Sequence, residues 1–182
     1  MLIEERRMLD KVKQFKWLIV LSFFLLAIPL YFVYNHSQQS SALKEAFEKN
    51  KRIEVLQRLM ASEKYASDIR KAGYTIPPDG AIRLDGGIDS IEIKGDMDLK
   101  ISNPGRNEVT VLFETTVKEE KIDVYYILDN QLTIKRSYYS NISNQKIKES
   151  VDISQAEEER LLKNVQKELE AFIEKMYQTL YG

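Results

Sequence analysis

An uninterrupted apolar run near the N-terminus constrains this chain more than any other feature. Residues 17–34 read WLIVLSFFLLAIPLYFVY and contain no charged side chain. A helix rises about 1.5 Å per residue, so the run would extend roughly 27 Å, close to the hydrocarbon thickness of a bilayer. Trp17 stands at one end, and Tyr31 and Tyr34 stand near the other, where aromatic residues anchor membrane helices. The pattern predicts one transmembrane helix anchored by these three residues.

Basic residues predict the orientation of this helix. Residues 1–16 contain five lysines and arginines, whereas the fifteen residues after the run contain two lysines. Because basic segments stay in the cytoplasm, we expect a basic cytoplasmic tail and a C-terminal domain outside it. The expected location is the plasma (inner) membrane, with the mitochondrial inner membrane as an alternative. A cleaved signal peptide is disfavoured, since the run ends in Tyr-Phe-Val-Tyr instead of small residues.

The rest of the chain predicts one extracytoplasmic domain of class α+β. Residues 35–41 form a short polar tether, and residues 42–182 are enough for one compact core. Apolar residues recur at helical spacing over residues 41–72, which predicts one long helix or two with a break near Ser62. Gly73 is a natural stop for this helical segment.

An antiparallel meander should follow. The clearest strands, by alternation of apolar and polar residues, are 108–118, 121–128 and 131–138. Shorter candidates are 81–84, 90–94 and 97–102. In the last strand the alternation runs through Leu132, Ile134 and Tyr138. Tight turns between consecutive strands favour direct pairing of neighbours.

A second amphipathic helix is predicted at the C-terminus. Ser154 and Glu157 have the spacing of a capping box. The apolar stripe consists of Leu162, Val165, Leu169, Phe172 and Met176. Such a stripe suits packing on the sheet, and it equally suits a partner helix, so these five residues are also a candidate partner-binding face.

Composition excludes several kinds of chemistry. The chain has no cysteine, which rules out a disulfide framework, a thiolate zinc site and a cysteine nucleophile. The only histidine, His36, stands beside the apolar run, so no serine–histidine pair is expected in the domain. The net charge of −1 gives no field that would attract nucleic acid. We therefore expect no enzyme, no cofactor, no metal site and no small-molecule substrate.

One cluster of carboxylates is a candidate site. It comprises Asp85, Asp89, Glu92, Asp96 and Asp98. Clustered oxygens suit calcium, and paired carboxylates can perform acid–base hydrolysis without histidine. The spacing does not match a calcium-binding loop, and the intervening isoleucines favour a solvated edge strand. An extracytoplasmic hydrolase that uses Asp85–Asp98 remains an alternative.

The order of elements resembles a known family. A membrane helix leads to an amphipathic helix over residues 43–72 and a Gly-Asp step at Gly95. Asn107-Glu-Val-Thr-Val-Leu-Phe113 then pairs with Ile122-Asp-Val-Tyr-Tyr-Ile-Leu128. This layout is similar to the small domain of the cytochrome oxidase assembly factor family, which includes related subunits of the mitochondrial inner-membrane translocase. The resemblance implies an anchored, non-catalytic helper of membrane-complex assembly.

The resemblance covers residues 17–138 and carries no site residue. Lys118-Glu-Glu-Lys121 stands where a lysine-glycine step is expected, and the helix over residues 154–180 is additional. The sequence thus predicts a membrane-anchored protein whose outer domain binds or scaffolds partner proteins. An inner-membrane scaffold of a type IV secretion or conjugation apparatus is an alternative with the same layout.

Overall fold

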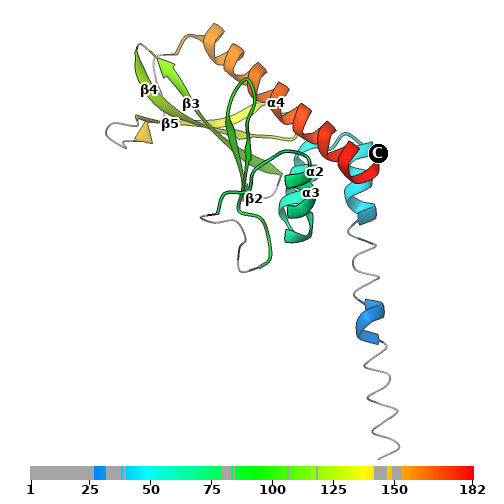
Figure 1. The fold of residues 1–182 in the computed structure, drawn as a ribbon. Helices are drawn as coiled ribbons and strands as arrows, with labels where there is room; N and C mark the ends of the chain where they lie inside the picture. The colour runs from blue at the N-terminus through cyan, green and yellow to red at the C-terminus, as the bar shows by residue number, and fades with distance from the viewer. Residues whose placement is uncertain are drawn as a thin grey trace, which may run out of the picture. The chain divides into compact units, whose positions relative to one another are not determined.

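The computed structural model describes residues 27–31, 38, 40–78, 83, 85–105, 107–117, 119–141, 147–148 and 153–182. By its contacts the chain divides into two compact units, Met1–Ala42 and Leu43–Gly182 (Figure 1). The second unit holds the sheet, the labelled helices and the hydrophobic core, and it is the unit in which the candidate sites lie.

The predicted single-pass membrane architecture requires correction. Across the residues with described positions, no helix combines the length and the apolar character that crossing a bilayer demands. Of the predicted span 17–34, only residues 27–31 are described. This finding overturns the transmembrane part of the predicted fold and the predicted membrane location. The predicted tail 1–16 lies outside the described residues, as does most of the tether 35–41.

The first helical segment breaks twice. Residues 40–48 are helical, and α2 (Arg52–Met60), the 3₁₀ turn η1 (Glu63–Tyr65) and α3 (Ala66–Lys71) follow. The break near Ser62 was predicted, whereas the break at Asn50 was not. Asn50 has φ 52°, and the N–H groups of Asn50 and Lys51 donate to the carbonyls of Phe47 and Ala46. This is a Schellman ending with Asn in the left-handed position.

The predicted stop at Gly73 is confirmed. Gly73 has φ +95°, and its N–H donates to Arg70 O at 3.0 Å. The N–H of Tyr74 donates to Ile69 O at 3.1 Å, so this end also has the Schellman pattern. Glycine adopts this φ without steric cost, which is why the helix ends here.

The sheet is an antiparallel meander, as predicted. In the described part of the chain it has six strands, which follow sequence order, and each pairs with the next. They are β1 (Ser90–Ile93), β2 (Leu99–Gly105), β3 (Glu108–Val117), β4 (Glu120–Leu128), β5 (Ile134–Asn141) and β6 (Ile147–Lys148). The α+β class is confirmed. The candidate strand 81–84 lies almost wholly outside the described residues.

The last predicted strand of the meander was misplaced in register. β5 begins at Ile134, three residues later than predicted, and its pairing with β4 shifts between Ile127 and Leu128. The extra residue reverses the alternation, because side chains change face at every position. Tyr139 is therefore buried in the core, at 5% exposure, and Tyr138 lies on the opposite face.

The C-terminal helix α4 (Gln155–Tyr181) covers the core beside α2 and α3 (Figure 1). The Ser154 side chain accepts the N–H of Glu157 at 3.3 Å, which confirms the predicted N-cap. The Glu157 carboxylate binds Arg160 instead of closing the capping box. The residues of α4 that are buried are Leu161, Val165, Glu168, Leu169, Phe172 and Met176.

Candidate functional site

A row of side chains crosses the outer face of the sheet, opposite the core. The backbone register aligns Lys100 of β2 with Leu112 of β3, Leu112 with Tyr125 of β4, and Tyr125 with Tyr138 of β5. Both chain neighbours of Lys100, Leu112 and Tyr125 are buried in the core, and so is Tyr139 beside Tyr138, so the row itself faces away from the core. We call Leu112, Tyr125, Tyr138 and the adjacent Ile127 the outer strip.

The outer strip is apolar but does not belong to the core. Ile127 is only 9% exposed, yet it lies outside the hydrophobic cluster that the helices and the inner face of the sheet build. Leu112, Tyr125 and Tyr138 are half-buried and also lie outside that cluster. Burial raises the pKa of the Tyr125 hydroxyl, and the Asp123 carboxylate adds to this. The strip is therefore a second apolar surface on the same sheet.

Charged residues border the outer strip. On one side Glu108 of β3 pairs with Lys135 and with Arg136 of β5, the latter at 3.0 Å. On the other side Glu114 of β3 pairs with Lys121 of β4 at 2.8 Å. Such surface ion pairs contribute little to stability, but they give the strip a polar rim. An apolar centre with a polar rim is the usual composition of a protein–protein interface.

A separate polar pocket of about 400 Å³ lies where three connections meet. It is lined by Asn50, Lys51, Glu54, Asn107, Asn130 and Gln131. These residues come from the break before α2, from α2 itself, from the β2–β3 turn and from the β4–β5 loop. We call this the polar pocket.

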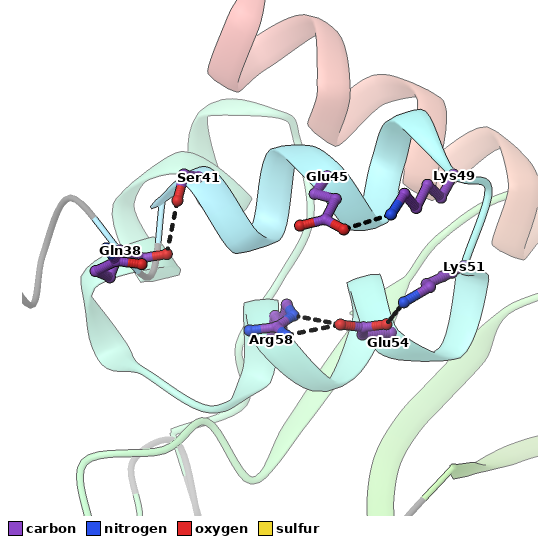
Figure 2. A network of polar contacts seen from close by, with 7 residues as sticks. All are labelled: Gln38, Ser41, Glu45, Lys49, Lys51, Glu54 and Arg58. Carbon is purple, nitrogen blue, oxygen red and sulfur yellow. Dashed lines mark hydrogen bonds and ion pairs between the residues drawn. The ribbon is translucent and has the colours of Figure 1, made fainter.

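Two residues that line the polar pocket, Lys51 and Glu54, belong to an ion-pair network with Arg58 (Figure 2). Glu54 Oε2 lies 2.8 Å from Lys51 Nζ, and Glu54 Oε1 lies 2.6 Å from Arg58 Nη2. The hydrogen bond from Lys51 and then the one from Arg58 lower the pKa of the Glu54 carboxyl. Glu54 is thus ionised at neutral pH and its charge is already compensated. Glu45 and Lys49 form a second, exposed pair at 2.6 Å (Figure 2).

Of the predicted membrane-anchor residues, only Tyr31 can be located. It is helical and 64% exposed. Trp17 and Tyr34 lie outside the described residues, and so does His36.

The candidate partner-binding face of α4 is occupied by the protein's own core. Val165, Leu169, Phe172 and Met176 are each 0% exposed, and Leu162 packs at the edge of the same cluster. Tyr74 packs edge-to-face on Phe172, with ring centroids 4.7 Å apart. This face therefore holds the domain together and presents no surface to a partner in this conformation.

The carboxylates between Asp85 and Asp98 do not converge. Asp85 accepts from Arg83 and from the N–H of Gly87, Asp98 pairs with Lys94 at 3.0 Å, and Asp96 pairs with Lys167 of α4 at 2.6 Å. Within the described part of the chain, no three acidic or histidine side chains are placed to hold one metal ion.

Sequence reasoning found the inner face of the sheet but not the outer strip. The same strands that alternate Val109, Val111 and Phe113 inward place Leu112 outward, and the Tyr-Tyr pair at 125–126 puts one ring on each face. The signal for the outer strip in the sequence was Leu112, an apolar residue at a position of β3 where the alternation predicts a polar one. The polar pocket had no such signal, because its residues come from three stretches of the chain that are far apart in the sequence.

Comparison with protein-family models, with curated proteins and with solved structures finds no match to this chain, and the layout resemblance to the cytochrome oxidase assembly factor family stays a prediction.

Proposed function

We propose that this protein works by binding, not by catalysis, and that its outer strip receives an amphipathic helix of a partner protein. The observation that carries the proposal is the outer strip itself: a second set of apolar side chains, outside the core cluster, on the face of the sheet opposite the core. Contiguous apolar surface with a polar rim is characteristic of interaction sites.

The dimensions of the outer strip favour a helix as the occupant. Leu112, Tyr125 and Tyr138 stand in one row on three adjacent strands. Strands lie about 4.8 Å apart, so the row spans roughly 10 Å. Two turns of helix cover about 11 Å, which places partner residues i, i+3 or i+4, and i+7 over the three side chains.

A charge beside the outer strip also supports a helix as the occupant, and it predicts how that helix is oriented along the strip. The row continues from Leu112 to Lys100 on β2, a cation at one end of the strip. A partner helix with an acidic residue beyond its apolar anchors would place that residue against Lys100. Tyrosine is enriched at binding hot spots, so Tyr125, in the middle of the row, should contribute most of the affinity.

Photo-crosslinking in cells that produce the full chain tests the proposal. A benzophenone side chain replaces Tyr138 in the outer strip, and in a matched protein it replaces Tyr177, a half-buried tyrosine of α4. We expect a discrete adduct from position 138 alone, and the crosslinked peptide should have amphipathic helical spacing. Adding Tyr125→Thr should reduce the adduct at least tenfold, since hot-spot truncation costs about 2 kcal/mol or more.

Three results would overturn the proposal. They are equal adducts from positions 138 and 177, an adduct that persists with Tyr125→Thr, and an adduct formed with a second copy of this chain. Circular dichroism of the Tyr125→Thr protein serves as the folding control. Because Tyr125 lies outside the core cluster, this variant should keep the helix and strand signal of the parent.

A further inference from the structure

The residues that line the polar pocket all have polar or charged side chains. All six lining side chains end in a hydrogen-bonding group, and four of them are carboxamides. A carboxamide offers two N–H donors and an acceptor oxygen, and a hydroxyl group likewise both donates and accepts. The pocket is therefore suited to a ligand that carries several hydroxyl groups.

The charges in the polar pocket favour a neutral ligand. Lys51 and Glu54 are the only charged residues in the described lining, and they pair with each other at 2.8 Å. Glu54 is held further by Arg58. A charged ligand would have to compete with this network, whereas a neutral ligand can add hydrogen bonds to it and leave it intact.

We propose that the polar pocket binds a neutral polyhydroxylated ligand of the size of a sugar ring. The volume of about 400 Å³ lies in the lower part of the range of small-molecule sites, roughly 300–1,000 Å³. A free monosaccharide and the terminal sugar of a glycan chain both carry this chemistry. The pocket is separate from the outer strip, so this binding neither requires nor replaces the partner helix.

Two of the residues that line the polar pocket have backbone conformations that suit glycine. Asn50 has φ 52° and Asn107 has φ 58°, both in the left-handed region that glycine tolerates best. Replacing both with glycine removes two carboxamides from the pocket without straining the backbone. Glu119, at φ 69° and exposed in the β3–β4 turn, provides a matched glycine control outside the pocket.

Nuclear magnetic resonance of the nitrogen-15-labelled full chain tests the proposal. The probes are glucose, N-acetylglucosamine, chitotriose and inorganic phosphate. We expect saturable shifts of the side-chain amide signals of Asn50, Asn107, Asn130 and Gln131 with at least one sugar, and none with phosphate. The Asn50→Gly/Asn107→Gly double variant should bind about tenfold more weakly, as the loss of two hydrogen bonds implies. Glu119→Gly should bind like the parent.

The outcomes separate the two sources and can overturn the proposal. Tighter binding of chitotriose than of N-acetylglucosamine assigns the site to a glycan end, and equal or tighter binding of a monosaccharide assigns it to a free sugar. The proposal is overturned if no sugar gives saturable shifts at millimolar concentration. Equal shifts with phosphate, or unchanged sugar affinity in the double variant, would also overturn it.

Discussion

The Glu168 carboxylate of α4 lies against the backbone of Gly95, in the turn between β1 and β2. A Cβ atom at position 95 would stand 2.3 Å from Glu168 Oε2, far inside van der Waals contact. Glu168 is only 9% exposed, so the carboxylate has little room to withdraw. The absence of a side chain at Gly95 is what allows α4 to close over this end of the sheet.

Gly95→Ala should therefore destabilise the domain by about 1–3 kcal/mol, the usual cost of overpacking. In a Glu168→Ala background the same substitution meets no carboxylate and should cost much less. Urea denaturation of the parent, the two single variants and the double variant gives the coupling energy between the two sites. Strictly additive effects would show that the contact does not constrain Gly95.

Asn50 offers a test of the unpredicted helix break. At φ 52° an alanine is strained, so Asn50→Ala should lower the free energy of unfolding by about 1 kcal/mol. Asn50→Gly keeps the left-handed conformation and should stay within about 0.5 kcal/mol of the parent. Equal losses for both variants in thermal denaturation would mean that the Asn side chain, and not its backbone conformation, sets the break.

Asp129 should make stability depend on pH through the β4–β5 loop. Its carboxylate accepts from the N–H groups of Gln131 and Thr133 and from the Thr133 hydroxyl at 2.7 Å. Burial raises the pKa of Asp129, but the hydrogen bonds from Thr133 and Gln131 outweigh it and hold the pKa below its usual value.

Because the folded pKa is lowered, the stabilisation is complete above the unfolded pKa of about 4 and is lost as the pH falls through the folded value. Asp129→Ala should cost about 1–2 kcal/mol at pH 7, and the difference from the parent should shrink below pH 4. Urea denaturation of the parent and of Asp129→Ala at pH 7 and at pH 3 measures the cost of the substitution at each pH. A difference that is independent of pH would indicate that the carboxylate charge does not organise the loop.

Calcium should have no effect on the segment between Asp85 and Asp98. Asp85, Asp96 and Asp98 each bind a different cation, and among the described residues no three acidic or histidine side chains are placed to share a metal ion. We expect 1–10 mM calcium, a concentration at which even weak calcium modules are occupied, to leave the melting temperature unchanged. A rise in melting temperature that Asp96→Asn abolishes would restore the calcium hypothesis.

Local patterns in the sequence predict most of the strands and helices correctly. The prediction is wrong where the pairing between strands overrides the local pattern. Alternation in β3 and β4 identified the buried residues, and Ser154 marked the start of α4. The register of β5 was missed because a bulge inserts one residue, and nothing in the alternation of Ile134 and Tyr138 reveals an insertion. Only the pairing of Val124 with Tyr139 shows which tyrosine is buried.

The candidate sites were harder to predict from the sequence than the strands and helices, because they depend on tertiary packing. The stripe of Val165, Leu169 and Phe172 fits a partner helix as well as a core, and only the packing of the domain decides between them. The carboxylates at Asp96 and Asp98 are two residues apart, but one binds α4 and the other binds Lys94. Their closeness in the sequence therefore did not show that Asp96 and Asp98 bind different partners.

If folding does not require the outer strip, two neighbouring residues of β3 should respond differently to substitution by threonine. This comparison is the most direct test of the account. Val111→Thr places a hydroxyl in the core and should cost about 1–3 kcal/mol, whereas Leu112→Thr puts the same side chain on the outer face. The measurement is the free energy of unfolding of both variants in urea. We predict that Leu112→Thr stays within about 1 kcal/mol of the parent. An equal or larger loss for Leu112→Thr would contradict the outer strip as a surface free for binding.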